Sequence, residues 1–197
     1  MNEQLSLFET PQRHMPRYNL VLAIFPDHDT GRQIYRLGES VQKMHGLYGR
    51  MRPFSHLHVS LPLPQLPANS SKIVIEIISR VCKAVGAVTS PFVIEFDRVM
   101  SFLGRSGTYP LVLVGDDHGN DGVRNLRRLL WAEFAKYISL NSPAPRFAPH
   151  LTLLYDKQHL DPGGIKPVSW TVREIVLVAS EVGATKYHLL GRWELGG

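Results

Sequence analysis

Residues 146–156 read RFAPHLTLLYD, an apolar, strand-forming run that contains a titratable histidine, His150. Leucines alternate here with His150 and Thr152, and residues two apart on a strand point to the same face. The pattern therefore predicts a strand with two different faces. One is aliphatic and packs on a core, and the other carries an imidazole beside a hydroxyl and lines a cleft.

The same arrangement occurs in LHVSLPLP at residues 57–64, where Ser60 follows His58 by two positions. Each histidine ends a strand–helix–strand unit, LVLAIF to HVSL in the first half of the chain and LVLVG to HLTL in the second. The distance from leading strand to histidine is nearly equal in the two copies, and an acidic residue follows each leading strand, Asp27 and Asp116. The repeat predicts two lobes related by an approximate two-fold axis, with the two histidines facing each other across a shared cleft.

Length and composition are those of a globular protein, with 197 residues, 44% of them hydrophobic. We expect a flexible tail over residues 1–17 and a single bilobal domain over 18–197. No apolar run is long enough to cross a bilayer and no secretory signal opens the chain, so we expect a cytoplasmic protein. The single cysteine, Cys82, is expected in the core. The net charge of +5 favours an anionic partner such as a nucleotide or RNA.

Hydrophobic periodicity predicts the elements around the two motifs. We expect strands at 18–26, 57–61, 92–103, 109–116, 150–155, 174–182 and 187–195, and helices from Thr30, over 70–85 and over 121–138. Thr30 with Gln33 is interpreted as a capping box, and DPGG at 161–164 as a turn. The expected buried positions are Ile34, Leu37, Val41 and Met44 in the first helix, Ile73, Ile77, Val81 and Val85 in the second, and Val123, Leu126, Leu130 and Phe134 in the third.

Two imidazoles across a cleft suit acid–base chemistry at phosphorus. A neutral imidazole can accept a proton from the attacking hydroxyl or water while a protonated one donates to the oxygen that leaves. The hydroxyls of Ser60 and Thr152, with backbone N–H groups, can hold the non-bridging phosphate oxygens in the transition state. The pattern thus points to phosphodiester transesterification or hydrolysis for which no metal or cofactor is required.

The paired motifs resemble those of the two-histidine (2H) phosphoesterase superfamily, and most closely its bacterial 2′-5′ RNA ligases, also described as RNA 2′,3′-cyclic phosphodiesterases. FAPHLTLLYD is similar to the second motif of that family and LHVSLPLP to the first. EIVLVAS and YHLLGRWEL look like its closing strands, so the resemblance covers residues 18–195.

The resemblance implies a bilobal α+β fold with antiparallel sheets related by a pseudo-two-fold around a central cleft. It also implies metal-independent action on 2′,3′-cyclic phosphate RNA ends, small cyclic nucleotides or 2′-5′ linkages, with possible reverse ligation. By position, His58 and His150 become the acid–base pair, and Ser60 and Thr152 hold the phosphate.

The sequence departs from the family pattern at two positions. The first motif has Ser60 where Thr is common, which keeps the hydroxyl. Many members carry a basic residue three positions beyond the second-motif Thr, and here that position is Tyr155, with Lys157 nearby. We expect Tyr155 to stack on a base or to hydrogen-bond a phosphate, with a substrate that differs from the family norm. Arg50 and Arg52, ahead of the first motif, are expected at the rim of the groove.

Three further interpretations stay open. His56 and His58, on one face of a strand, could bind a metal together with His150. Alternatively, the fold could be a catalytically silent module that binds a nucleotide or RNA without turnover. In the tail, QLSLF at Gln4–Phe8 resembles the short peptide with which bacterial DNA-metabolism proteins dock to the sliding clamp; otherwise its apolar side chains pack on their own domain, or the match is chance.

Overall fold

Two short strands at the centre of one antiparallel sheet carry the two motifs. The computed structural model describes residues 17–66, 71–104, 107–116, 118–140 and 146–196, and the expected tail segment Gln4–Phe8 lies outside these residues. Within them the chain forms eight strands, three α-helices and two 3-10 helices. The elements are β1 (Tyr18–Ile24), α1 (His28–Met44), η1 (Phe54–His56), β2 (Val59–Leu61), α2 (Ser71–Ala87), β3 (Phe92–Ser101), β4 (Tyr109–Val114), η2 (His118–Asn120), α3 (Asp121–Phe134), β5 (His150–Asp156), β6 (Gly163–Val172), β7 (Glu174–Glu181) and β8 (Tyr187–Glu194).

The strand order confirms the internal repeat. Across the sheet the strands run β6-β3-β4-β5-β2-β1-β7-β8, and all neighbours are antiparallel. β5 and β2 therefore lie side by side at the centre of the sheet. β4, β3 and β6 follow outward from β5, and β1, β7 and β8 follow outward from β2. The units β1–α1–β2 and β4–α3–β5 occupy equivalent places about this centre. The two predicted lobes are thus joined through β2 and β5 into one continuous sheet.

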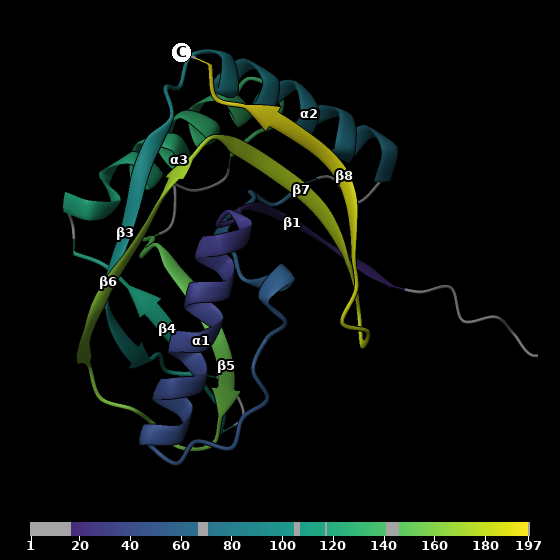
Figure 1. Cartoon of the computed structure of the whole chain (residues 1–197). Helices are drawn as coiled ribbons and strands as arrows, with labels where there is room; N and C mark the ends of the chain where they lie inside the picture. The colour runs from purple at the N-terminus through teal and green to yellow at the C-terminus, as the bar shows by residue number, and fades with distance from the viewer. Residues whose placement is uncertain (1–16, 67–70, 105–106, 117, 141–145, 197) are drawn as a thin grey trace, which may run out of the picture.

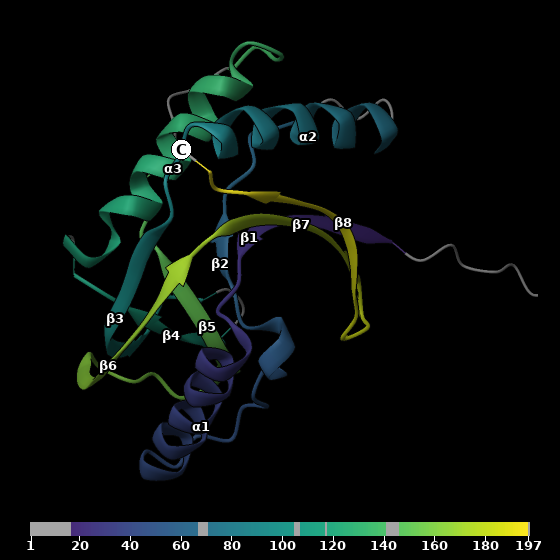
Figure 2. The same ribbon diagram turned by 45° about the horizontal axis from the view of Figure 1, so that its top comes forward.

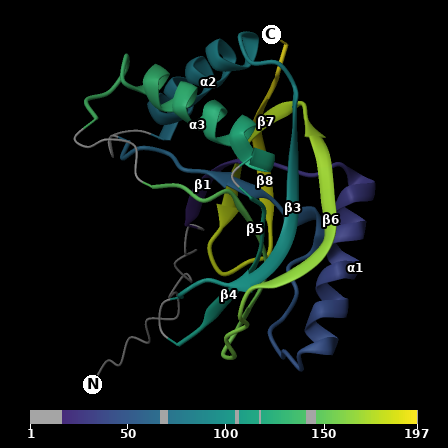
Figure 3. The same ribbon diagram turned by 90° about the vertical axis from the view of Figure 1, so that its left-hand side faces the viewer.

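The helices pack on the sheet in two groups, with α2 and α3 together and α1 apart from them. α2 packs against α3 and against β7 and β8, while α3 contacts β3. Figures 1 and 2 show α2 along the outer side of the arch made by β7 and β8, with α1 well apart from it. α1 contacts η1 and β6, and Figure 3 shows β3 and β6 side by side next to it. No helix in the described part of the chain is long and apolar enough to span a membrane.

Equivalent acidic residues turn the chain from strand into helix in both halves. Asp27 is the N-cap of α1, and its carboxylate accepts hydrogen bonds from the Thr30 N–H at 2.9 Å and the Thr30 hydroxyl at 2.8 Å. Asp116 in the same way accepts from the Gly119 N–H at 2.6 Å. The predicted capping box of Thr30 and Gln33 is therefore wrong. Asp27 already accepts the N–H three residues on, and Thr30 lies within the first turn as a donor.

The buried faces of the helices confirm part of the prediction. All four expected residues of α3 are buried, as are Ile34 and Val41 in α1. In α2, Val81 and Val85 are buried as expected, but Ile73 is 53% exposed while Val74 and Ile78 are buried, and in α1 Met44 is 78% exposed. In the first half of α2, the apolar pairs at 73–74 and 77–78 allowed two stripes, and packing against α3 and the sheet selected the one with Val74 and Ile78.

Strand β6 was not expected, because its residues 163–172 mix glycine, proline and polar side chains. It lies at the edge of the sheet, next to β3 only. An edge position tolerates Pro167, since one side of an edge strand needs no ladder donor. Cys82 lies in the core as predicted, and its burial raises the pKa of the thiol to about 12.

Candidate active site

Both motif histidines are fixed in the same way by the backbone before them. The Nδ1–H group of His58 donates to the carbonyl oxygen of His56 at 2.8 Å, and that of His150 donates to the carbonyl of Ala148 at 2.9 Å. A carbonyl oxygen can only accept, so each Nδ1 carries a proton. In the neutral ring, the lone pair is therefore on Nε2, which is the nitrogen that can accept a proton.

The register of the central strands places the two motifs side by side. Val59 pairs with Leu151, and both side chains are fully buried. In an antiparallel pair, one step along each strand sets Ser60 beside His150 and the other step sets His58 beside Thr152. These four side chains share the face opposite to Val59 and Leu151, which we call the histidine face. The structure thus brings together all four residues expected from the two motifs.

Aromatic rings and a hydroxyl surround the half-buried His58. The rings of Phe25 and Tyr187 lie 5.6 Å and 6.0 Å from its own, centroid to centroid, and its Nε2 is 3.0 Å from Ser60 Oγ. In the neutral state the Ser60 hydroxyl is the donor in that contact. His150, by comparison, lies 5.0 Å from the ring of Phe102.

The surroundings of His58 favour its neutral form. Burial lowers the pKa of His58 below its usual value, and the hydrogen bond to the His56 carbonyl opposes this only in part. The charges of Arg52, His56 and His150 lower this pKa further. Because the charge of one motif histidine acts on the other, the two rings are electrostatically coupled across the β2–β5 pair.

A β-bulge in β5 places Tyr155 on the histidine face. Thr152 pairs with Val112 but Leu154 pairs with Leu111, so Leu153 is an extra residue in the ladder. The extra residue reverses the alternation beyond it, and Tyr155 points to the same side as Thr152 rather than to the opposite side. Its side chain is 49% exposed, between the buried Leu154 and Asp156.

The turn before the first motif is locked to the end of β5. Oδ2 of the buried Asp156 accepts the N–H groups of Tyr48 and Gly49, each at 2.6 Å, and Oδ1 accepts that of Gln158 at 2.8 Å. Burial acts to raise the pKa of Asp156, but these N–H groups outweigh it, so the pKa is lowered. A Cβ at Gly49 would lie 2.0 Å from the carbonyl oxygen of Tyr155, so this close approach requires glycine.

Arg52 reaches Tyr155 from that turn. Its backbone N–H donates to the carbonyl of the bulged Leu153 at 2.8 Å, and its guanidinium carbon lies 5.4 Å from the centre of the Tyr155 ring. The contact from Nη2 to the Tyr155 hydroxyl is long, at 3.4 Å. Burial raises the pKa of Tyr187, and the nearby Arg52 charge opposes this. Arg52 is thus at the rim of the site, as expected, and close to two phenol groups.

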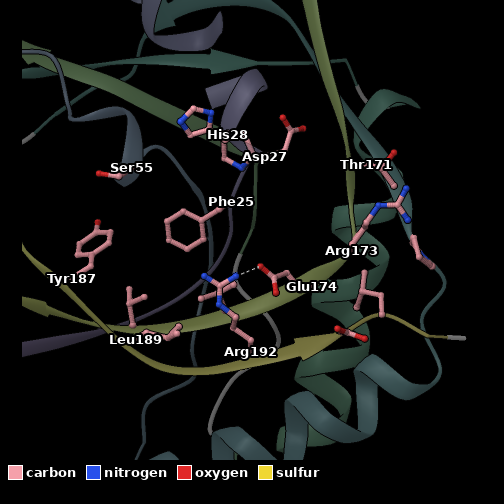
Figure 4. Close-up of a pocket in the computed structure, with 16 residues that line it drawn as sticks. Phe25, Asp27, His28, Ser55, Thr171, Arg173, Glu174, Tyr187, Leu189 and Arg192 are labelled. Carbon is pink, nitrogen blue, oxygen red and sulfur yellow. Dashed lines mark hydrogen bonds and ion pairs between the residues drawn. The ribbon is translucent and has the colours of Figure 1, made fainter. Parts of the chain in front are cut away.

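A cavity of about 970 Å³ lies on the β8 side of His58, although neither motif histidine lines it. Phe25 and Tyr187, which both contact the His58 ring, belong to its lining together with residues of β7 and β8 (Figure 4). Arg192 also lines it and donates to Glu174 at 2.6 Å. The pairings that run from Ser60 through Ala23 and Val176 to Arg192 show that the cavity floor continues the histidine face.

The structure does not support His56 as a partner of His58 on one strand. His56 lies in η1, and its ring stacks on Tyr187 with 4.0 Å between centroids and 2° between planes. In the described part of the chain, no group of three or more His, Cys, Asp or Glu side chains is arranged to hold a metal ion. The sequence did not single out Phe25, Phe102 or Tyr187, because nothing in their local pattern distinguishes them from core aromatic residues.

The fold and the site together define a two-histidine phosphoesterase. A family model described as 2′-5′ RNA ligase superfamily matches residues 33–184, and the chain belongs to this superfamily. The fold and family expected from the sequence are thereby confirmed, and membership supports an enzyme of the phosphoesterase class. No curated protein matches the chain.

Solved structures share this fold over nearly the whole chain. The crystal structure of E. coli LigT in apo form is 26% identical with a TM-score of 0.69, covering 92% of this chain and 99% of that one. The complex of E. coli LigT with 3′-AMP is 23% identical with a TM-score of 0.65, covering 93% of this chain and 100% of that one. The structure of TT0787 of Thermus thermophilus is 20% identical with a TM-score of 0.69, covering 93% of this chain and 99% of that one.

Replacing Asp156 tests the lock between the turn and β5. We expect Asp156→Asn to lower the free energy of unfolding at neutral pH by about 2 kcal/mol, since an amide cannot accept all three N–H groups. Because folding lowers the pKa of Asp156, its stabilisation is complete above the unfolded-state pKa near 3.8 and is lost as the pH falls below it. The difference between wild type and variant in urea unfolding should therefore shrink on acidification.

The matched control is Asp29→Asn, whose side chain is 99% exposed. This variant should lower the free energy of unfolding by less than about 1 kcal/mol, because it removes only an exposed charge from the first turn of α1. If Asp156→Asn were as stable as the Asp29 variant at neutral pH, the lock would carry no stability.

Proposed function

We propose that the protein is a phosphodiesterase that opens 2′,3′-cyclic phosphate RNA ends or cleaves 2′-5′ linkages, by acid–base catalysis from His58 and His150 that needs no metal ion. The observation that carries the proposal is the matched pair of imidazoles. Each has its Nδ1–H bound to a backbone carbonyl, which leaves the lone pair of the neutral ring on Nε2, and each has a hydroxyl on the same face of the sheet. Two equivalent histidines so arranged suit a reaction with one proton taken up and one delivered.

His58 is the better base of the proposed pair, because its lowered pKa keeps Nε2 unprotonated near neutral pH. In the hydrolysis of a cyclic phosphate, Nε2 of His58 takes a proton from water as the water oxygen bonds to phosphorus. The bond from phosphorus to one ribose oxygen then breaks, and Nε2–H of His150 donates its proton to that oxygen. The Thr152 hydroxyl, and the Ser60 hydroxyl once it turns from Nε2 of His58 to the substrate, donate to non-bridging oxygens, where negative charge develops.

Similar structures support nucleotides as ligands. E. coli LigT was solved in complexes with 3′-AMP, phosphate and ATP. The cavity beside His58 offers the aromatic rings of Phe25 and Tyr187 to a base or ribose on that side of the scissile bond. The net charge of +5 favours approach of an RNA end. We also propose a cytoplasmic location for this reaction.

The alternative is a module that binds nucleotides without turnover. The departure of Tyr155 from the family pattern favours this alternative. It predicts saturable binding of 3′-AMP without opening of a cyclic phosphate.

Substitution of each histidine tests the acid–base pair. In the presence of EDTA, the wild type should open a 2′,3′-cyclic-phosphate oligoribonucleotide to one monophosphate isomer, which identifies the oxygen that leaves. His58→Ala and His150→Ala should each lower kcat by about 100-fold or more. The exposed His45 at the end of α1 supplies the control His45→Ala, which should match the wild type. If either motif variant kept wild-type kcat, the paired mechanism would be wrong.

The pH dependence tests the assignment of His58 as the base. A base must be unprotonated, so kcat/KM should rise as the pH passes upward through the pKa of free-enzyme His58. Since burial and nearby positive charges lower this pKa, the acidic limb should lie below 6.5. NMR titration of the His58 ring should give the same midpoint. If the acidic limb of kcat/KM lay above pH 6.5 and matched the NMR titration of His150 instead, the roles of the two histidines would be reversed.

Docking of the Gln4–Phe8 segment to a bacterial sliding clamp stays a prediction from the sequence. A peptide of residues 1–12 should bind the clamp in a fluorescence titration. The same peptide with Leu7→Ala and Phe8→Ala should bind at least tenfold more weakly, because the hydrophobic plug is removed. Equal affinity of the two peptides, or no binding by either, would exclude this role.

A further inference from the structure

Arg52 lies among aromatic and imidazole groups rather than among acids. Its guanidinium is 5.4 Å from the ring centre of Tyr155 on β5, and it is close enough to Tyr187 on β8 for its charge to act on that phenol. Burial lowers the pKa values of His56 and His58, and the same charge lowers them further. A single cation is therefore held where β5, β8 and the first motif meet.

This cation lacks a carboxylate partner within the described residues. No described Asp or Glu oxygen forms an ion pair with Arg52, whereas Arg192 in the cavity beside His58 is paired with Glu174. Nε of Arg52 is buried, and it has no hydrogen-bond acceptor among the described residues. No anion therefore balances the charge of this half-buried guanidinium, which costs free energy unless a ligand supplies the negative charge.

The position of Arg52 is set by the backbone and not only by its side chain. The Arg52 N–H is bonded to the carbonyl of Leu153, the extra residue of the β-bulge, and two residues of the preceding turn are bound by Asp156. The bulge that puts Tyr155 on the histidine face thus also anchors Arg52 beside it. Such fixed placement is what a phosphate-binding arginine requires, since its fork of donors must be oriented in advance.

We propose that Arg52 binds a non-bridging phosphate oxygen of the substrate beside His58, with Tyr155 and Tyr187 holding its guanidinium in place. The inference rests on the proposed phosphodiesterase function and adds the charged group that the two motifs lack. The cation reaches the histidine face from the turn before the first motif, and its backbone N–H is bonded to the bulge of β5.

Substitution of Arg52 tests this assignment on the full-length protein. With the 2′,3′-cyclic-phosphate oligoribonucleotide, Arg52→Gln should lower kcat/KM by about 100-fold and Arg52→Lys by about tenfold, because a lysine keeps the charge but not the fork. Inhibition by inorganic phosphate should weaken at least tenfold in Arg52→Gln. Arg80→Gln, an exposed arginine on α2, is the control and should keep wild-type values.

The pH profile separates a charge near the base from a purely structural effect. The charged or titratable groups that act on His58 are Arg52, His56 and His150, and Tyr187 contacts its ring. Removal of the Arg52 charge should raise the pKa of His58, so the acidic limb of kcat/KM should move to higher pH in Arg52→Gln. Arg52→Lys should leave the limb near its wild-type position.

A relocated arginine provides a gain-of-function test. Because the bulge directs position 155 to the histidine face, the double variant Arg52→Gln with Tyr155→Arg should recover at least tenfold of the kcat/KM lost in Arg52→Gln. Circular dichroism melting should show that every variant is folded.

The outcomes distinguish this inference from the proposed function. If the wild type opens the cyclic phosphate and folded Arg52→Gln matches it in kcat/KM and phosphate inhibition, the role of Arg52 is overturned while the function stands. If the wild type shows no turnover, calorimetric titration of the wild type and Arg52→Gln with inorganic phosphate still tests whether Arg52 binds phosphate. At least tenfold weaker binding by Arg52→Gln would support the site, and equal binding would overturn it.

Discussion

The pairing of β2 with β5 is the interaction on which the rest of the site depends. It joins the two halves of the sheet at the pseudo-two-fold, and Val59 and Leu151 face each other there with no exposed surface. Burial of each of these side chains stabilises the fold by about 1.5–3 kcal/mol, and that burial fixes which face is left for the histidines. A shift of β2 against β5 by one residue would put the two imidazoles on opposite faces of the sheet.

The site is assembled from equivalent and non-equivalent parts. The two halves supply matched histidines, each locked through Nδ1 to the carbonyl two residues before it, with a hydroxyl two residues after it. The surroundings then differ, since Arg52, Tyr187 and Phe25 gather on the His58 side while Phe102 contacts His150. This asymmetry is what can give two identical side chains different protonation states, and so different roles in one reaction.

The sequence predicted the repeat, the central strands and the buried face of α3, because each of these follows from hydrophobic periodicity over many residues. It did not predict the N-cap at Asp27, because Asp27 and Thr30 are both residue types that can begin a helix. It also missed β6, because an edge strand tolerates an atypical composition. The bulge at Leu153 could not be predicted from the sequence for a different reason. Simple alternation from His150 places Tyr155 on the buried face, and only the pairing of β5 with β4 reverses it. The approach of Arg52 to Tyr155 depends in turn on this bulge and on Gly49 and Asp156.

The central claim is that the two imidazoles act on one phosphate from the same face of the sheet. Nitrogen-15 NMR of the histidine rings, recorded with and without 3′-AMP, tests it most directly. The account predicts that His58 and His150 are both protonated at Nδ1 in their neutral forms, and that 3′-AMP perturbs Nε2 of both rings at one saturating concentration. A response from only one of them, or an Nε2-protonated neutral form of either, would contradict it.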